Sequence, residues 1–452
     1  MTGALPRILL AAPKSGAGKT TVVCGLLQAL VNRGMRPAAC KCGPDYIDPL
    51  FHSEIIGAKG CNLDLFFTGE QAARRLLLES AEGCSLAVLE GVMGYYDGVG
   101  GVTEQASAYH VAAATETPAI LILDARGASL SLCAQLRGFL SFRPQSRIAG
   151  VILNRCTPAQ YRMLADAIRT ECGVPALGYL PSLPACALES RHLGLVTAQE
   201  VDGLRQKLQD LAAAVEQSVD LDAVLSLART APPLHSPEPP DAPALSGTHP
   251  VLAVARDRAF CFYYRENLRL LERLGARLRF FSPLEEDVLP PCDGLYLGGG
   301  YPELYAGRLS ANRSMRESIR TAVGEGLPTF AECGGFLYLH QTLTDEDGPH
   351  PMAGVFPGGC HSTGRLRRFG YVTLTARTDN LLCPAGAQIR AHEFHYFDSD
   401  CNGSDFSAEK PVSGRKWDCI HASPTLFAGF PHLYFPANPD FARRFVRRLK
   451  ES

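Results

Sequence analysis

The sequence has no apolar run that approaches the roughly 18 residues of a membrane-spanning helix, which excludes a helical membrane protein. It also has no excess of charge, because 44 Lys and Arg oppose 46 Asp and Glu and leave a formal net charge of −2. So neutral a chain offers no broad basic face to nucleic acid or to an anionic membrane. Its N-terminal apolar stretch of about six residues is too short for a signal-peptide core. We therefore expect a cytoplasmic protein with no nucleic-acid or membrane partner.

None of the 16 cysteines stands at the CxxC spacing that structural zinc and redox sites favour. In a protein that is not secreted, such cysteines are expected to be reduced and mostly buried. Cys333 is the exception, because its sequence context predicts chemistry.

Short apolar runs alternate with amphipathic segments of helix length, which indicates a parallel sheet covered by helices on both faces. The expected strands of the first half are residues 7–12, 37–41, 86–91, 119–125, 149–155 and 175–181. Residues 231–243 contain six prolines in thirteen positions and therefore predict a domain boundary. Beyond it the alternation restarts, with expected strands in VLAVARD, RLRFFSP, GLYLGGG and PTFAECGG.

At roughly 100–200 residues per domain, 452 residues suit two or three domains, and the pattern favours two α/β domains. We place a first domain at residues 1–229, a proline-rich linker at 230–248 and a second domain at 249–445.

A glycine-rich loop follows the first expected strand and precedes a helix, as a phosphate-binding loop does. Gly16 and Gly18 allow backbone N–H groups to face phosphate oxygens at the helix N-terminus. We expect Lys19 to contact the β- and γ-phosphates and the Thr20 hydroxyl to ligate Mg²⁺. With Lys14 the loop reads KxGxGKTT. That pattern resembles the dethiobiotin-synthetase and MinD-like P-loop proteins, in which the extra lysine also reaches phosphate.

Acidic residues follow the neighbouring expected strands, where loops line the ligand crevice of a doubly wound sheet. They are Asp45, Asp48, Glu90 and Asp97. Glu90 ends a strand and is the natural carboxylate near Mg²⁺, and Lys41 lies in the same loop region as Asp45. Asn154 also ends a strand, from which it could read the adenine edge.

PTFAECGGF predicts a nucleophile elbow: a strand, then Cys333, two glycines and the helix-like FLYLHQTL. The helix dipole should lower the pKa of the Cys333 thiol and favour thiolate. The N–H of Gly334 can stabilise an oxyanion, and Gly299, in a glycine run, is expected to supply a second donor. A thiolate nucleophile also needs a histidine to move protons, and His432 is available.

These motifs together resemble the cobyrinic acid a,c-diamide synthase family over the whole chain. In the family's order they are KxGxGKT, KCGPDYIDP, NLDLF, LEGVMGYYDG, GVILNR, ESRHLGL, FCFYYRENLRLLE, LYLGGGYPEL, AECGGF, RAHEFHY and PHLYFPANP. The resemblance implies a dethiobiotin-synthetase-like P-loop domain joined to a class I glutamine amidotransferase-like α/β domain.

It also implies a ligase that activates the a and c acetates of a corrinoid with ATP as acyl phosphates, and amidates them with ammonia from glutamine. Cys333 would form the thioester and His432 would be its base. ATP would be held by Lys14, Gly16, Gly18, Lys19, Thr20, Thr21 and Asn154, and Mg²⁺ by Thr20, Asp45 and Glu90. The corrinoid would contact Lys41, Tyr46, Asp48, Arg191 and His192, with Asp45 and Asp97 serving the chemistry and Gly299 and Gly334 the oxyanion.

The sequence departs from ordinary class I glutaminases next to His432. They carry an acid two residues after the histidine, whereas this chain has Tyr434. It also reads GFPHLYF where the family commonly has SYxHLHF. An imidazole without an orienting acid is a poorer base, so we predict a slow or synthetase-coupled glutaminase.

Three alternatives remain at this stage. A MinD- or ParA-like ATPase switch would explain the loop but not the elbow at Cys333. A cobyric acid synthase has the same two-domain plan, and a nickel-sirohydrochlorin diamide synthase performs nearly the same reaction on a related ring. The sequence allows a homodimer without requiring one.

Overall fold

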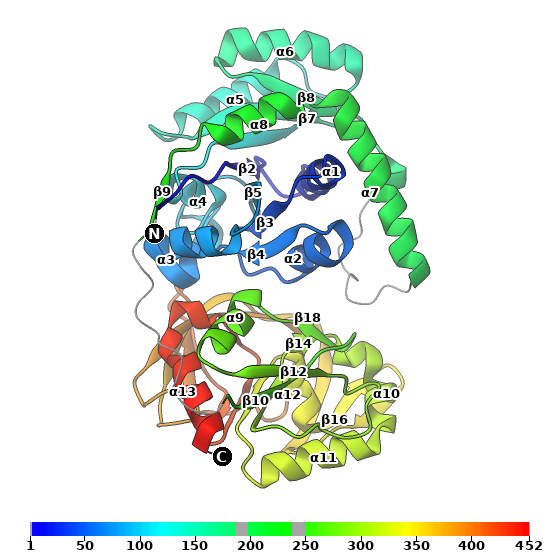
Figure 1. Cartoon of the computed structure of the whole chain (residues 1–452), viewed down its shortest axis with the longest axis vertical. Coiled ribbons are helices and arrows are strands. Elements are labelled where there is room, and N and C mark those ends of the chain that lie inside the picture. Colours follow the sequence, from blue (N-terminus) through cyan, green and yellow to red (C-terminus); the bar gives the residue numbers. More distant parts are fainter. Residues whose placement is uncertain (1, 187–197, 237–248, 452) are drawn as a thin grey trace. The chain divides into compact units, whose positions relative to one another are not determined.

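The chain divides into two units, Met1–Pro239 and Pro240–Ser452, and each is described here by itself (Figure 1). The computed structural model describes residues 2–186, 198–236 and 249–451. Within those residues, no helix has both the length and the apolarity that crossing a bilayer requires. The two-residue strand β9 (Leu234–His235) lies within the expected linker and pairs with β1 (Thr2–Gly3). The finer domain boundaries stay a prediction.

A seven-stranded sheet forms the centre of the first unit, in the order β4-β3-β5-β2-β6-β7-β8. All its neighbouring strands are parallel. The strands are β2 (Arg7–Ala11), β3 (Pro37–Lys41), β4 (Lys59–Asn62), β5 (Leu86–Glu90), β6 (Ala119–Asp124), β7 (Ile148–Asn154) and β8 (Ala176–Leu180). The six expected strands and the α/β fold class are confirmed; β4, a short KGCN segment, was not expected.

Helices α1 (Lys19–Asn32), α7 (Ala198–Ser218) and α8 (Leu221–Arg229) share a core with one face of this sheet. Leu27 of α1 and Val215 of α7 are buried there with Ile8 of β2. The remaining helices of the unit are α2 (Ile47–Phe51), α3 (Leu65–Ser80, interrupted at Gly69), α4 (Ala108–Ala114), α5 (Ser131–Ser141) and α6 (Pro158–Cys172). Because the strands are parallel, the loops after them meet along one edge, where the chemistry is expected.

Cys40 and Cys61 form a disulfide, which corrects the expectation that these two thiols are reduced. They are register partners on the adjacent strands β3 and β4, with Cα atoms 4.6 Å apart. That separation lies in the range of disulfides. The pairing depends on β4 joining the sheet beside β3, which no cysteine spacing reveals.

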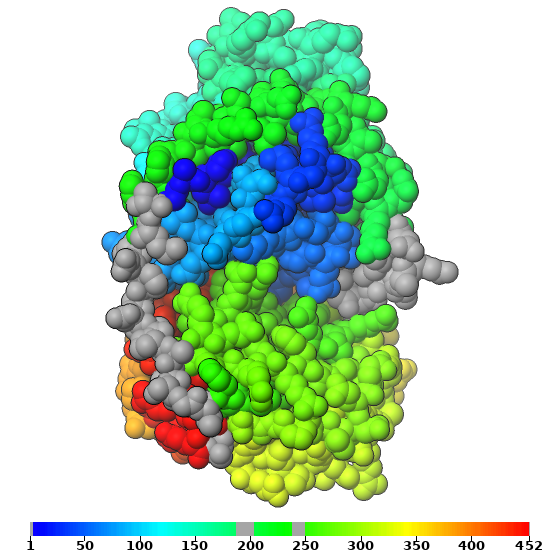
Figure 2. All heavy atoms as spheres, viewed as in Figure 1, coloured from blue at the N-terminus to red at the C-terminus, as the bar shows by residue number. Residues whose placement is uncertain are grey.

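The second unit has a six-stranded sheet in the order β12-β10-β13-β15-β23-β22, parallel except at β22. Its strands are β10 (Val251–Ala255), β12 (Arg277–Phe281), β13 (Gly294–Leu297), β15 (Thr329–Glu332), β22 (His421–Ala422) and β23 (Leu426–Gly429). The four strands expected after the linker are confirmed. Helices α9 (Arg265–Arg273) and α13 (Pro439–Glu451; red in Figure 1 and Figure 2) share one core with this sheet. Helices α10 (Ala306–Ala311), α11 (Arg313–Gly324) and α12 (Gly334–Leu339) share another.

A second, largely antiparallel sheet of this unit was not expected from the sequence. It has the order β17-β16-β18-β19-β24, with β20 on β18 and β21 on β20. Its strands are β16 (His340–Asp345), β17 (Gly348–Pro351), β18 (Phe356–Ala376), β19 (Gln388–Ser399), β20 (Phe406–Glu409), β21 (Lys416–Cys419) and β24 (His432–Leu433). The helix that was expected to run through FLYLHQTL ends earlier, at Leu339, and strand β16 begins at His340. The β-branched Thr342 and Thr344 favour this strand.

Candidate active sites

The phosphate-binding loop lies between β2 and α1, with two of its glycines in left-handed backbone conformations. Gly16 has φ +79° and Gly18 has φ +84°. A Cβ atom at Gly18 would overlap the side-chain amide of Asn154. This overlap and the positive φ both disfavour any other residue at position 18. Lys14 is exposed, and Thr21 is half-buried in the first turn of α1.

Asn154, which ends β7, and the next residue, Arg155, both contact the phosphate-binding loop. Asn154 Nδ2 donates to the carbonyl of Ala17 at 2.8 Å. Arg155 donates to the carbonyl of Gly16 at 3.2 Å and forms an ion pair of 2.7 Å with Asp124, which ends β6. The contact of Asn154 with adenine stays a prediction. The roles of Arg155 and Asp124 were missed, because they depend on the order β2-β6-β7.

Glu90 meets the first turn of α1 at the end of β5. Its Oε1 accepts a hydrogen bond from the Thr20 hydroxyl at 2.9 Å and lies 3.7 Å from Lys19 Nζ. Burial raises the pKa of Glu90, but the positive charges of Lys41 and Lys19 outweigh it and lower the pKa to about 2. Glu90 is therefore a carboxylate at neutral pH, next to the hydroxyl expected to ligate Mg²⁺.

The donors at this point fit a magnesium ion bound together with phosphate. Glu90 Oε2 is buried and has no hydrogen-bond partner among the described residues, and Thr20 supplies a second oxygen. The described residues contain no group of three His, Cys, Asp or Glu side chains that could hold a metal. Mg²⁺ commonly takes one or two protein ligands and completes its shell with phosphate and water.

Lys41 lies at the centre of the acids predicted around the loop. Its Nζ is 2.9 Å from Glu90 Oε1 and 4.0 Å from Asp45, and it also forms an ion pair with Asp48. Burial lowers the pKa of Lys41, but the attraction of Glu90, Asp48 and Asp45 is stronger and raises it well above its usual value. Lys41 is thus a buried ammonium that holds three carboxylates together. Its predicted contact with the corrinoid stays a prediction.

Asp45 gains a proton more readily than Glu90 does. Burial and the neighbouring Asp48 raise the pKa of Asp45 to about 6. Its Oδ1 accepts hydrogen bonds from the backbone N–H of Ile47 at 2.9 Å and of Asp48 at 3.3 Å, which fixes the turn before α2. Tyr46 lies in the same turn and is half-buried. Asp45 therefore takes up a proton at a higher pH than an ordinary aspartate does.

Asp97 lies in a segment beside the phosphate-binding loop, and His52 lies near Glu90. Asp97 Oδ2 accepts from the backbone N–H of Gly94 at 3.0 Å, and a Cβ at Gly94 would touch the carbonyl of Pro13 in the phosphate loop. The segment with Asp97 thus packs on the phosphate loop. His52 Nε2 lies 3.7 Å from Glu90 Oε2, although burial lowers its pKa. Arg191 and His192 lie outside the described residues.

In the second unit, Cys333 occupies the strained turn between β15 and α12 that the sequence predicted. Its φ is +44°, a conformation that few residues with a side chain adopt. Its backbone N–H donates to the carbonyl of Gly429 at 2.8 Å, and its Sγ lies 4.0 Å from the carbonyl of Phe394. Strain held at one cysteine by the surrounding sheet is typical of a nucleophile elbow.

The expected lowering of the Cys333 pKa is wrong. Burial raises the pKa of this thiol well above its usual value, and the nearby acids Glu303, Glu332 and Glu393 raise it further. The backbone N–H of Gly334 lowers it by less than these effects raise it. The resting residue is therefore a thiol, because desolvation and nearby acids outweigh the end of a six-residue helix.

The two glycines predicted for the oxyanion lie close together at this turn, because a Cβ at Gly334 would lie 3.3 Å from the carbonyl carbon of Gly299. A Cβ at Gly334 would lie 3.0 Å from the backbone nitrogen of Gly300 and from Pro302 Cδ. A Cβ at Gly299 would lie 2.5 Å from Cε1 of His432. The structure therefore brings Gly299, Gly334 and His432 together around Cys333. Their roles in catalysis stay predictions.

His432 lies on β24, where it pairs with His392 of β19. Burial and the nearby His395 lower the pKa of His432 to about 3, so its imidazole is neutral at neutral pH. The residue two positions after His432 is Tyr434 and not an acid. Tyr434 is fully buried against the ring of Tyr264, at 5.0 Å between ring centres. A neutral thiol and a neutral imidazole are thus the resting pair.

Glu332, directly before Cys333, links the nucleophile to the histidine strand. Its Oε1 accepts from the backbone N–H of Leu433 at 2.6 Å, and its Oε2 accepts from the Tyr296 hydroxyl at 2.8 Å. Burial raises the pKa of Glu332 to about 8. Glu332 is a functional residue that was missed from the sequence, where its signal is an acid at the end of an apolar strand, directly before the predicted nucleophile.

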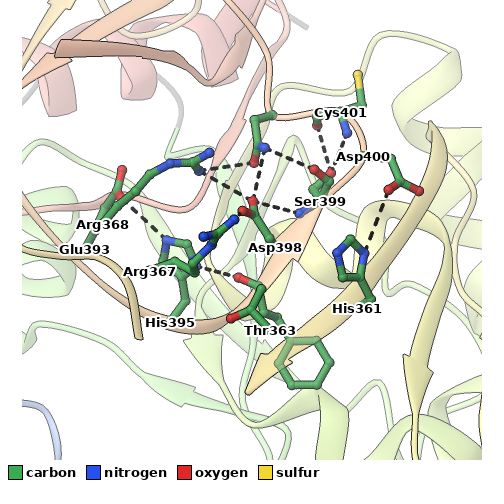
Figure 3. A network of polar contacts seen from close by, with 12 residues as sticks. His361, Thr363, Arg367, Arg368, Glu393, His395, Asp398, Ser399, Asp400 and Cys401 are labelled. Atoms are coloured by element: carbon green, nitrogen blue, oxygen red, sulfur yellow. Dashed lines mark hydrogen bonds and ion pairs between the residues drawn. The ribbon is translucent and has the colours of Figure 1, made fainter. Parts of the chain in front are cut away.

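A second pair near His432 was also missed, although it lies within the motif RAHEFHY. His395 Nε2 lies 3.4 Å from Glu393 Oε2, and its Nδ1 lies 2.6 Å from the carbonyl of Phe397 (Figure 3). A carbonyl oxygen only accepts hydrogen bonds, so Nδ1 of His395 carries a proton. A hydrogen bond between Nε2 of His395 and Glu393 then requires a second proton, carried by one of these two side chains. The His395 ring stacks on Phe430, two residues before His432, at 3.9 Å between ring centres.

Both units match known protein families. Residues 8–196 match the family described as the CobQ/CobB/MinD/ParA nucleotide binding domain. Residues 251–439 match the CobB/CobQ-like glutamine amidotransferase domain.

Three curated relatives resemble the chain over nearly its whole length, and each is named cobyrinate a,c-diamide synthase. The protein of Salmonella typhimurium strain LT2 is 41% identical and covers 97% of each chain. That of Listeria monocytogenes serovar 1/2a is 40% identical, over 96% of this chain and 97% of the other. That of Gloeobacter violaceus is 41% identical, over 98% and 96%.

Proposed function

The chain belongs to the cobyrinate a,c-diamide synthase family, and from this premise we propose that it amidates the a and c acetate carboxylates of cobyrinate or hydrogenobyrinate. It is an amidating ligase that uses glutamine, with a nucleotide-binding domain and a glutamine amidotransferase domain. The finer steps below are part of the proposal.

In the nucleotide-binding domain, the loop N–H groups, Lys14 and Lys19 bind the phosphates of ATP. Thr20, Glu90 and Asp45 hold Mg²⁺, which when bound neutralises phosphate charge and orients the γ-phosphate. The 2.9 Å contact between Thr20 and Glu90 supports this assignment, because it places two oxygen ligands at the start of α1. Lys41 keeps Glu90 ionised and in position.

The corrinoid carboxylate must be activated, because ammonia does not displace an unmodified carboxylate oxygen. The carboxylate oxygen attacks the γ-phosphorus of ATP and ADP leaves, which gives an acyl phosphate. Ammonia then attacks the acyl carbon, inorganic phosphate leaves, and loss of a proton from the nitrogen gives the amide. The segment with Asp97 packs on the phosphate loop, so it lies where it can exclude water from this intermediate. Lys41, Tyr46 and Asp48 lie at the same strand edge and are assigned to the substrate.

Ammonia comes from glutamine in the second domain. His432 takes the proton of the Cys333 thiol as Sγ attacks the amide carbon, and the N–H groups near Gly299 and Gly334 stabilise the oxyanion. His432 then protonates the leaving ammonia, and water hydrolyses the thioester. Since thiol and imidazole are both neutral at rest, proton transfer accompanies attack, which agrees with a slow glutaminase.

The observation that carries the proposal is the strained turn at Cys333 in a chain that also holds a phosphate-binding loop. Mass spectrometry of products from cobyrinate and hydrogenobyrinate, with ATP, Mg²⁺ and glutamine, tests it. We expect two amides on one of these substrates. Cys333→Ala should lose glutamine-dependent amidation and keep ammonia-dependent amidation, with Cys84→Ala as the control. No mass change with either ring would refute the corrin assignment.

A further inference from the structure

A cavity of about 600 Å³ lies in the second unit, outside the reacting groups assigned above. Its lining includes four acids, Glu303, Asp345, Glu346 and Asp347, and one basic side chain, His361. This surplus of negative charge opposes the phosphates of ATP and the carboxylates of a corrinoid, and it favours a cationic group.

Among the acids of this cavity, Glu303 is half-buried and forms no ion pair within residues 249–451, whereas Glu346 and Asp347 are exposed. Glu303 follows Pro302 in the short 3₁₀ turn Pro302–Tyr305. Asp345 pairs with His350 at 2.9 Å. Burial raises the pKa of Glu303 to about 7. A desolvated carboxyl without a counter-ion is stabilised by any cation that binds to it.

Glu303 also lies close to the nucleophile. Pro302, one residue before it, packs against Gly334, one residue after Cys333: a Cβ at Gly334 would lie 3.0 Å from Pro302 Cδ. Among the charged groups that raise the pKa of the Cys333 thiol, Glu303 has the largest effect. Strand β19 makes a second connection, because the Phe394 carbonyl contacts Cys333 Sγ and Phe397 lines the cavity.

Glutamine has a cationic group at the required position. Its α-ammonium nitrogen is four bonds from the amide carbon that Cys333 attacks, roughly 5 Å when extended at ordinary bond lengths. We propose that Glu303 binds the α-ammonium group of glutamine and so selects an α-amino acid amide over simpler amides. The proposal rests on the assignment of Cys333 as the glutaminase nucleophile. Glu303 acts as a binding residue and takes no part in the bond changes at Sγ.

The test compares two amides in the full-length enzyme: glutamine, and 4-carbamoylbutyrate, which is glutamine without its α-amino group. Glutamate or glutarate release is measured for wild type, Glu303→Gln and the control Glu346→Gln, an exposed acid of the same cavity. We expect Glu303→Gln to raise KM for glutamine on the order of 10- to 100-fold, as loss of a charged hydrogen bond does. It should leave kcat/KM for 4-carbamoylbutyrate unchanged, and Glu346→Gln should resemble wild type.

Equal losses of activity toward both amides in Glu303→Gln, or no change toward either, would overturn the proposal. Amidation with free ammonia must be the same in both variants, which separates binding from misfolding. As a further readout, KM of wild type for glutamine should rise as pH falls below about 7, while that of Glu303→Gln stays level. If wild type releases no glutamate at all, the proposed glutaminase itself fails, and that result is distinct from wild-type hydrolysis without a Glu303 effect.

Discussion

Lys41 and Glu90 form a buried ion pair between register partners on the adjacent strands β3 and β5, with Nζ 2.9 Å from Oε1. Each is almost wholly inaccessible to solvent, at 3% and 1% exposure. Lys41 also holds Asp48, and Glu90 also holds Thr20. The pair therefore connects the acid-rich loop after β3 with the phosphate-binding helix α1.

Glu90→Gln should destabilise the chain and abolish ATP-dependent amidation. Removing one partner of a buried pair costs up to about 3–5 kcal/mol, and the loss here should lie toward the lower end because Lys41 keeps its ion pair with Asp48. Urea unfolding followed by circular dichroism measures the change in stability. The double variant Lys41→Met with Glu90→Gln should recover part of it without recovering activity. A stable Glu90→Gln with normal amidation would contradict both roles.

The pKa of about 6 at Asp45 predicts two pH effects of opposite sign. The ordinary value is 3.8, so the folded chain takes up a proton between about pH 6 and pH 4 that the unfolded chain does not. Asp45 therefore adds stability as pH falls through that window. Binding of Mg²⁺–nucleotide should instead weaken below about pH 6, because a protonated carboxyl is a poor ligand.

Calorimetric titration of a non-hydrolysable ATP analogue with Mg²⁺ checks the second effect in wild type and Asp45→Asn. The ATP analogue gains the same protons in both experiments. The difference between wild type and Asp45→Asn in affinity against pH therefore reports the contribution of Asp45. We expect that difference to disappear below about pH 5, where Asp45 is uncharged. Parallel curves across the range would remove Asp45 from the metal site.

Cys333 should react slowly with iodoacetamide when glutamine is absent. Its thiol pKa is raised by burial and by Glu303, and only the thiolate is nucleophilic. Peptide mass spectrometry at neutral pH should find Cys333 labelled no faster than the half-buried Cys84. Rapid, selective labelling of Cys333 would mean that the resting enzyme already holds a thiolate.

Fourteen thiols should titrate in the unfolded, unreduced protein, because Cys40 and Cys61 are bonded and fourteen cysteines are free. Ellman's reagent in guanidinium chloride measures this number, and prior reduction should raise it to 16. The variant Cys40→Ala with Cys61→Ala should give fourteen with and without reductant. A count of 16 before reduction would mean that β3 and β4 are not linked.

The local parts of both centres could be predicted from sequence, because each is a short turn between a strand and a helix. Lys19, Thr20 and Cys333 lie where such turns place them. The partners that set their charges could not be predicted, because they arrive from distant strands. Glu332 meets Leu433 only because β24 joins the second sheet, whose long strands β18 and β19 alternate apolar and polar residues only over short stretches such as 371–376 and 388–391.

The contact between Gly18 and Asn154 links two positions 136 residues apart, because the Asn154 amide fills the space beside a glycine that already has φ +84°. Evolution can therefore change position 154 only to side chains that still leave room for the loop backbone, and can change position 18 hardly at all. A library that varies the phosphate loop to alter nucleotide choice should vary residue 154 in the same clones. Varied singly, position 18 should yield almost no functional members, whatever nucleotide is supplied.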